Sequence, residues 1–293
     1  METKARCATA PASSANLGPG FDALGLALGL YVRVCVSPAA EFSLASSGEG
    51  SELPTNRSHL AARVVIEVLG HDRVAISVHS QIPLARGLGS SAALALAAAA
   101  AAGSEDPLGV AVGHEGHPEN AAASFAGGLV AAAMVDDRPI ARPLPLDERL
   151  GFVVMVPEAE LSTSEARSAL SAQVPHSDAA FNLGRMGLLV SGLGRREDLV
   201  PQAFEDRLHQ SQRSKLFPEA TRLIEAIVDQ GAYGACWSGA GTTILAVCRV
   251  EDAAILAAKA NQVMVHLGVA GQAMHLQADR SGLMVGDGPA PWL

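Results

Sequence analysis

Pro83-Leu84-Ala85-Arg86-Gly87-Leu88-Gly89-Ser90-Ser91-Ala92-Ala93 leads into an alanine-rich run that extends to Ala102. Alanine is the strongest helix former, so the run predicts a helix. Gly87 and Gly89 let the backbone turn tightly and approach a ligand closely. The free N–H groups and positive dipole end of a helix's first turn favour a phosphate, and serine hydroxyls bind phosphate oxygens or a metal. The stretch therefore predicts an anion site in an enzyme that handles a nucleotide.

Three other kinds of glycine-rich loop have sequences that partly match this stretch. A Walker loop needs a lysine after its last glycine, and Ser90 stands there. A dinucleotide-binding loop matches Gly87-x-Gly89-x-x-Ala92, but Gly18-x-Gly20-x-x-Ala23 matches as well, so the pattern alone is weak. Pro83 also separates the loop from the strand before it, and no acidic residue is evident at the end of a second strand. A glycine turn that only caps a helix is the third alternative, and the loop alone leaves it open.

The composition limits the class of protein. The chain has 293 residues, 49% hydrophobic and 17% charged, which suits one large domain or two ordinary ones. A net charge of −9 and 4% aromatic residues disfavour a nucleic-acid surface. The sequence shows no signal peptide, and the run from Ala92 to Ala102 is shorter than the ~20 residues that span a bilayer. We therefore expect a soluble cytoplasmic protein without nucleic-acid or membrane partners.

The four cysteines form no C-x-x-C pair and show no regular spacing. In a cytoplasmic protein this pattern is typical of reduced thiols that are mostly buried. We therefore expect free thiols at Cys7, Cys35, Cys236 and Cys248.

Strands and helices alternate without a strict βαβα order, which favours an α+β fold over a doubly wound sheet. The residue patterns predict strands at 5–10, 26–36, 74–78, 129–135, 152–156, 244–248 and 271–277. They predict helices after an N-cap at Ser58, from 92 to 102, after the capping box Ser162-x-x-Glu165, and near 178–192, 219–230 and 252–261. Turn-rich segments are expected at 11–22 and 113–120. The proline-rich run 136–149 is interpreted as a connection between domains at 1–147 and 148–293.

The string Pro-x-x-x-Gly-Leu-Gly-Ser-Ser-Ala-Ala resembles the phosphate loop of the GHMP kinases, which wraps the ATP phosphates without a Walker lysine. Gly239-Ala240-Gly241 resembles the glycine turn that packs beside this loop in that superfamily. The resemblance implies a two-domain α+β fold with the phosphate loop in the N-terminal half, a ferredoxin-like C-terminal half, and the active site between them. It implies ATP and Mg²⁺ as cofactors. The ATP-binding residues that it implies are Pro83, Arg86, Gly87, Leu88, Gly89, Ser90, Ser91, Ala92, Ala93, Gly239 and Gly241.

Within that superfamily, Ser14-Ala15-Asn16-Leu17-Gly18 ahead of Gly20-Phe21-Asp22 is similar to the homoserine kinase family. Mevalonate kinases carry a lysine in this motif, and none lies between Arg6 and Arg33. Segments 115–120, 162–167 and 206–218 agree with the same family, although Glu119 stands where aspartate is usual. The resemblance implies phosphorylation of the hydroxyl of a small-molecule substrate, L-homoserine, by ATP, which is a step toward threonine.

The chemistry of that substrate explains the residues that match the family. Homoserine is a zwitterion with a primary hydroxyl, and its carboxylate suits the forked guanidinium of Arg167 and Arg213, with His117 beside them. Its ammonium needs a carboxylate or amide acceptor, which Asp22 and Asn16 supply. These five residues are the expected substrate-binding set.

Phosphoryl transfer also needs charge neutralisation, usually by Mg²⁺ held by a hydroxyl and a carboxylate. The resemblance assigns these ligands to Ser91 and Glu115, with Ser90 on a phosphate. Asn120 and Thr163 are expected to act near the transferred group, without a dedicated base.

Two other functions stay open at this point: a GHMP kinase for another small hydroxyl compound, and a catalytically silent ATP-binding sensor. The sensor is disfavoured because the expected metal ligands and substrate-binding charges are all present. A homodimer is compatible with the sequence, which does not reveal the oligomeric state.

Overall fold

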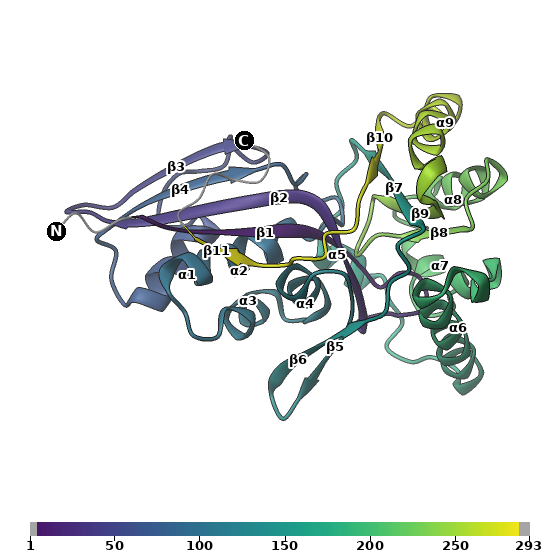
Figure 1. Cartoon of the computed structure of the whole chain (residues 1–293), viewed down its shortest axis with the longest axis horizontal. Coiled ribbons are helices and arrows are strands. Elements are labelled where there is room, and N and C mark those ends of the chain that lie inside the picture. The colour runs from purple at the N-terminus through teal and green to yellow at the C-terminus, as the bar shows by residue number, and fades with distance from the viewer. Residues whose placement is uncertain (1–4, 287–293) are drawn as a thin grey trace.

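Two sheets, each packed against helices, form the frame of the computed structural model, which describes residues 5–286 (Figure 1). The larger sheet has seven strands in the described part and follows the order β11-β1-β2-β4-β3, with β5 paired to β2 and β6 to β5. Only β3 and β4 pair in parallel among these residues. The strands are β1 (Arg6–Ala15), β2 (Leu24–Pro38), β3 (Ser43–Gly48), β4 (Val74–Ser80), β5 (Leu129–Val135), β6 (Arg138–Leu144) and β11 (Met284–Val285).

Four helices pack against this sheet: α1 (Leu60–Leu69), α2 (Ser90–Ala102), α3 (Pro107–Glu115) and α4 (Glu119–Ala126). Helix α2 lies in the middle of this half, in contact with β1, β2 and the other three helices. Nine of its residues are buried. A helix that is apolar all round is normally buried. Its small alanine side chains let the neighbouring elements come close on every side.

The C-terminal half has a four-stranded antiparallel sheet in the order β10-β7-β9-β8. Helices α8 and α9 pack against it, and the chain order β7, α8, β8, β9, α9, β10 is the ferredoxin-like arrangement that the family resemblance implies. The elements of this half are β7 (Leu150–Pro157), α5 (Thr163–Ser168), α6 (His176–Gly194), η1 (Arg196–Asp198), η2 (Pro201–Phe204), α7 (Gln210–Arg213), α8 (Glu219–Asp229), β8 (Gly234–Trp237), β9 (Ile244–Arg249), η3 (Val250–Asp252), α9 (Ala253–His266) and β10 (Gly271–Leu276). The α+β fold class is therefore confirmed.

After β10 the chain returns to the N-terminal half, as the yellow end of the ribbon shows in Figure 1. The Tyr31 hydroxyl donates to Asp279 Oδ2 (2.9 Å), Leu28 pairs with Ala278, and β11 pairs with β1. The expected domain boundary at residue 147 stays a proposal. The segment after β10 belongs with the N-terminal half, because its contacts are with β1 and β2.

Four expectations about local structure are wrong. The first strand does not stop at residue 10 but continues to Ala15, because both faces of β1 are buried. Residues 113–120 are mostly helical, with α3 and α4 joined by a short turn. The connection 136–149 contains β6, which forms a hairpin with β5. Helix α1 is capped by His59 rather than Ser58, since His59 Nδ1 accepts from Ala61 N (3.2 Å).

The expectation that all four cysteines are free is also wrong. Cys7 on β1 and Cys35 on β2 stand directly opposite each other and form a disulfide. Their pairing follows from strand register, which their separation in sequence does not reveal. Cys236 and Cys248 are buried free thiols, as expected.

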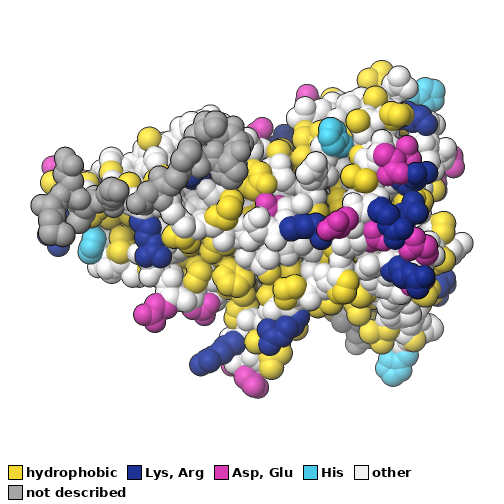
Figure 2. Space-filling model, viewed as in Figure 1, with side chains coloured by type: hydrophobic (Ala, Val, Ile, Leu, Met, Phe, Trp, Pro, Cys, Tyr) yellow, Lys and Arg dark blue, Asp and Glu magenta, His cyan; other side chains and the backbone are white. Residues whose placement is uncertain are grey.

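The charged side chains of the C-terminal half are mixed in sign on the face shown in Figure 2. Arg149, for example, contacts both Asp147 and Glu197 at 2.6 Å. Within residues 5–286, no helix is both long enough and apolar enough to cross a membrane.

Candidate active site

The phosphate loop, Pro83–Ser91, is shaped by two glycines in the left-handed region. Gly89 precedes the first residue of α2 with φ of +66°, and a Cβ there would overlap Ser13 Oγ. Gly87 has φ of +75°, and a Cβ there would overlap Ser238 O and lie 2.8 Å from Gly241 N. Glycine at these two positions avoids both the left-handed strain and the overlaps, so the loop can lie tightly under the start of α2. The N–H groups of the first turn of α2 have no acceptor within the helix and are available to an anion.

The glycine turn of the C-terminal half packs directly on this loop. Ser238 Oγ donates to Gly87 O (2.7 Å), and Thr243 N donates to Arg86 O (3.2 Å). Asn16 joins the same assembly, because its Nδ2 donates to Gly239 O (2.9 Å). The structure thus brings together the N-terminal motif, the phosphate loop and the Gly239–Gly241 turn.

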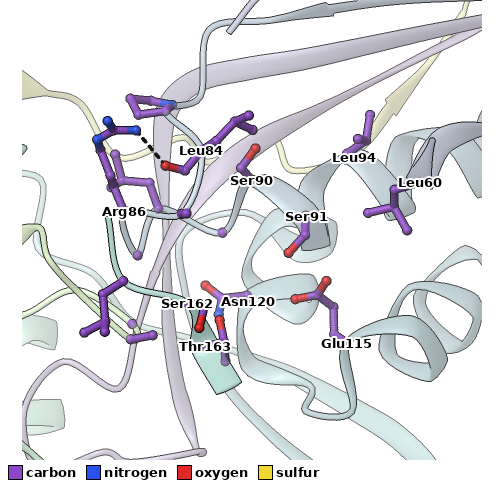
Figure 3. A pocket seen from close by; sticks show the side chains of 18 of the residues that line it. Leu60, Leu84, Arg86, Ser90, Ser91, Leu94, Glu115, Asn120, Ser162 and Thr163 are labelled. Carbon is purple, nitrogen blue, oxygen red and sulfur yellow. Dashed lines mark hydrogen bonds between the residues drawn. The ribbon is translucent and has the colours of Figure 1, made fainter. Parts of the chain in front are cut away.

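Arg86 is directed toward backbone carbonyls. Its guanidinium donates to Leu84 O (2.8 Å), drawn in Figure 3, and to the carbonyl oxygens of Pro157 (3.0 Å) and Glu158 (2.9 Å). These bonds anchor the phosphate loop to the end of β7. The expected contact between Arg86 and ATP stays a prediction. Leu88, Ala92 and Ala93 are buried, so only their backbone atoms offer polar groups there.

A cavity of about 440 Å³ opens beside the phosphate loop. Part of its wall is apolar and suits a nucleotide base, with side chains from Leu53, Pro54, Leu60, Leu84, Leu94 and Leu161. The polar part contains Asn16, Ser90, Ser91, Glu115, His117, Glu119, Asn120, Thr163, Arg167 and Arg213. Most of the expected site residues therefore line one cavity. Asp22 does not line it, but it is hydrogen bonded to Arg167, which does.

Ser91, from α2, and Glu115, from the end of α3, lie close to each other in this cavity (Figure 3). Burial raises the pKa of Glu115, and a hydrogen bond to Ser91 and the charge of His117 oppose that rise. A half-buried carboxylate beside a hydroxyl is a hard oxygen pair, and Mg²⁺ commonly takes one or two carboxylates together with phosphate oxygens and water. The donor set fits Mg²⁺ bound jointly by protein and nucleotide. Within the described residues, no group of three or more acidic, histidine or cysteine side chains forms a closed metal cage.

Arg167 and Arg213 both lie close to the aromatic ring of Phe21. Their guanidinium carbons are 5.8 Å and 5.4 Å from the Phe21 ring centroid. Arg167 donates to both carboxylate oxygens of Asp22, at 2.7 Å and 3.0 Å, and this pairing raises the pKa of Arg167. Burial and, to a smaller extent, the nearby charge of Arg167 lower the pKa of Arg213 to about 10. Two guanidinium groups held this close together favour a bound anion between them.

His209 holds Arg213 in place, a role that the sequence analysis did not assign. Its Nε2 lies 2.8 Å from Gly18 O and therefore carries the proton, which leaves Nδ1 to accept from Arg213 Nη1 at 3.1 Å. Arg213 Nη1 also donates to Gly239 O (2.8 Å). Burial lowers the pKa of His209 to about 4 and keeps the ring neutral. The signal was present in the 206–218 motif, where His209 precedes Arg213 by one helical turn.

The remaining expected residues lie near the start of α4 and α5. Asn120 Oδ1 accepts from Ser13 Oγ (3.0 Å), and Figure 3 shows Thr163 beside Asn120. Thr163 is the first residue of α5, and the expected capping box between Ser162 and Glu165 is present. Burial opposes a charge on His117, but neighbouring Glu119 raises its pKa above the usual value.

Comparison with protein families now defines the class. The chain matches the GHMP kinases N terminal domain over residues 56–128 and the GHMP kinases C terminal domain over residues 180–266. The first match covers α1 to α4 with the phosphate loop, and the second covers most of the ferredoxin-like half. The chain has the architecture of an ATP-dependent small-molecule kinase.

Among the GHMP kinases, the chain is similar to individual homoserine kinases. The chain is 43% identical to a homoserine kinase of Thermus thermophilus, over 85% of this chain and 89% of the relative. It is 38% identical to a homoserine kinase of Leifsonia xyli, over 94% and 90%. The crystal structure of homoserine kinase from Cytophaga hutchinsonii superimposes with a TM-score of 0.84 at 25% identity, over 98% and 99% of the two chains. This chain belongs to the homoserine kinase family of GHMP kinases.

Proposed function

We propose that the protein transfers the γ-phosphoryl group of ATP to the side-chain hydroxyl of L-homoserine, a step toward threonine. The observation that carries this substrate assignment is the pair of guanidinium groups of Arg167 and Arg213, which line the same cavity as the phosphate loop. A carboxylate bound by this pair fixes one end of a small hydroxy acid. Homoserine has that carboxylate and, three bonds from the carbon that bears it, the hydroxyl to be phosphorylated.

The phosphate loop binds the nucleotide in this proposal. N–H groups at the start of α2 donate to phosphate oxygens, and Gly87, Gly89 and the Gly239–Gly241 turn allow the backbone to approach them. Ser91 and Glu115 hold Mg²⁺, which neutralises phosphate charge when bound. Glu115 is held for this task by the end of α3 and by its contact with Ser91.

The acceptor hydroxyl lies near Asn120 and Thr163 in the proposal. Phosphoryl transfer depends mainly on positioning and electrostatics, and so the site needs no strong base. The Asn120 side chain is fixed by Ser13, and Thr163 is fixed at the start of a capped helix. These two side chains orient the hydroxyl, while His117 and the arginines hold the amino-acid end.

The test is a comparison of acceptors. Purified protein with Mg·ATP should release ADP with L-homoserine much faster than with mevalonate, galactose or no acceptor. Phosphorus NMR should identify O-phosphohomoserine as the product. Equal rates with all acceptors would exclude the substrate assignment, and ATP binding without turnover on any of them would favour a sensor.

A further inference from the structure

His114 directly precedes Glu115, the carboxylate proposed to hold Mg²⁺, but has no role in the site described so far. Both residues belong to the last turn of α3, which ends at Glu115 and is capped by Gly116. The buried residues of α3 end at Val112, whereas His114 and Glu115 are only half-buried. The position of Glu115 therefore depends on what else holds this last turn.

The turn has little packing around its backbone. Gly113 and Gly116 flank it, and glycine leaves the backbone more conformational freedom than any other residue. In the described part of the chain, nothing beyond the local backbone lies within 4 Å of a Cβ added at either glycine. A surface hollow of about 450 Å³ also separates α3 from α1 here, lined by Glu67 on one side and by Val110 and His114 on the other.

The side chain of His114 bridges the two helices at this hollow. Its Nδ1 lies 3.2 Å from Arg63 Nη2, and its Nε2 lies 2.9 Å from Glu67 Oε2. A guanidinium can only donate a hydrogen bond, so Nδ1 accepts from Arg63 and Nε2–H donates to Glu67. Both ring nitrogens are thus used, and the ring has one defined orientation.

Helix α1 gives this bridge a fixed support. Arg63 and Glu67 are four residues apart and therefore lie on one face of α1. The opposite side of the helix is buried, with Val64 and Val65 in the core, and α1 packs against α2. At its start, Leu60 lines the same cavity as Glu115. The bridge therefore fixes the end of α3 relative to a helix that already forms part of the nucleotide side of the cavity.

We propose that His114 is a positioning residue, which holds Glu115 in place for Mg²⁺ by tying the last turn of α3 to Arg63 and Glu67. This inference rests on the proposed role of Glu115 as a metal ligand. Without the bridge, the turn between the two glycines would shift and carry the carboxylate away from Ser91.

A purely stabilising role would look different. The Glu67 side chain is 59% exposed, and exposed charged pairs contribute little to the overall stability of a protein. Loss of the bridge should therefore leave the fold intact and change the metal site instead. Metal affinity and stability can be measured separately.

The test measures how much Mg²⁺ strengthens the binding of a non-hydrolysable ATP analogue. Calorimetry gives the dissociation constant of adenylyl imidodiphosphate with EDTA and with saturating Mg²⁺, and the ratio of these constants is the Mg²⁺ gain. His114→Ala and Glu67→Ala remove the bridge, whereas Glu67→Gln keeps an oxygen that accepts from Nε2–H. Asp72→Ala is the matched control, because it breaks another exposed ion pair, between Arg57 and Asp72, on residues that flank α1.

His114→Ala and Glu67→Ala should lower the Mg²⁺ gain about 10-fold, a typical loss when a group that orients a metal ligand is removed. The constant measured with EDTA should stay unchanged, which also shows that the variants are folded. Glu67→Gln and Asp72→Ala should keep the wild-type gain. Glu115→Gln should lower the gain at least as far, and adding His114→Ala to it should cause no further loss, because the histidine acts through that carboxylate.

Four results would overturn the inference. The first is a wild-type gain in His114→Ala. The second is a further loss when His114→Ala is added to Glu115→Gln, which would mean that the histidine does not act through Glu115. The third is an equal loss in Glu67→Gln and Glu67→Ala, and the fourth is an equal weakening of the analogue with and without Mg²⁺ in His114→Ala.

Failure of the proposed site and function can be told apart from these results. A wild-type gain in Glu115→Gln would show that the metal ligand lies elsewhere, and the inference would be wrong together with that assignment. A wrong substrate assignment would leave all these binding constants as expected, since none of them depends on turnover, and the wild-type protein would then not phosphorylate homoserine.

Discussion

Gly87→Ala tests the geometry of the phosphate loop directly. The residue has φ of +75°, and an added Cβ would overlap Ser238 O and lie 2.8 Å and 2.9 Å from Gly241 N and Gly241 O. All three atoms belong to backbone, which cannot rotate away as a flexible side chain would. The substitution must therefore move the loop away from the Gly239–Gly241 turn or break the contact between them.

The cost has two parts. A left-handed backbone costs alanine about 1–2 kcal/mol, and overpacking against fixed backbone adds about 1–3 kcal/mol. The free energy of unfolding should fall by about 2–5 kcal/mol, the sum of these two costs. Displacing the loop by ~1 Å should also reduce kcat/KM for ATP by about 100-fold, because reacting groups tolerate little misplacement.

Two matched glycine variants separate these costs. Gly268 has φ of +70° with nothing within 4 Å of an added Cβ, so Gly268→Ala carries the backbone cost alone. Gly113 lies in α3 with open space around it, and Gly113→Ala should stabilise the protein by about 0.5–1 kcal/mol. Urea denaturation and ATP-dependent kinetics are measured on all three variants. The reasoning is refuted if Gly87→Ala loses no more stability than Gly268→Ala and keeps its kcat/KM for ATP.

The other predictions concern the two ends of the substrate and one buried histidine. Arg167→Ala should raise the KM for L-homoserine about 10- to 100-fold, since the carboxylate loses a charged partner, and an unchanged KM would show that α5 does not face the substrate. Glu115→Gln should raise the Mg²⁺ concentration needed for half-maximal rate, and an unaltered Mg²⁺ titration would place the ligand elsewhere. Burial lowers the pKa of His209 to about 4, so the unfolded chain takes up its proton first as the pH falls below about 6.5, and wild-type stability is lost from there down to about pH 4. His209→Gln should reduce the stability difference between pH 7 and pH 5 in urea denaturation, and an equal difference in both proteins would mean that His209 is not buried as a neutral ring.

The fold class and the position of the phosphate loop follow from local sequence. An alanine run after Gly-x-Gly-Ser-Ser has few structural alternatives, and it does form α2 with Gly89 at its N-terminus. Strand ends are harder to predict, because turn residues such as Pro11 and Ser13 lie within β1 where tertiary packing buries them. The disulfide between Cys7 and Cys35 depends on the register of two strands, which no local pattern specifies.

The same contrast applies to the candidate site: the sequence predicts which residue types it contains, but not which residues they contact. Matching positions in the family's motifs mark Arg167 and Arg213 as candidates, and both line the cavity. Their actual partners are long-range: Asp22 lies 145 residues before Arg167, and Gly239 lies 26 residues after Arg213. Among the described residues no donor reaches the buried Oε2 of Glu119, which is visible only when every nearby donor has been placed. The residues of the site can therefore be predicted from sequence, whereas the folded structure is needed to show which of their polar atoms already have a hydrogen-bond partner.

The hydrogen bonds that join Ser238 to Gly87 and Asn16 to Gly239 also bear on how the chain matures. These contacts span 151 and 223 residues. Contacts of such long sequence separation carry a large loop-closure cost and tend to form late. A nascent chain cannot complete them until residue 239 has left the ribosome, by which time the whole N-terminal half has emerged. Nucleotide that binds beside both segments therefore stabilises only a chain in which the two segments have been made and have come together.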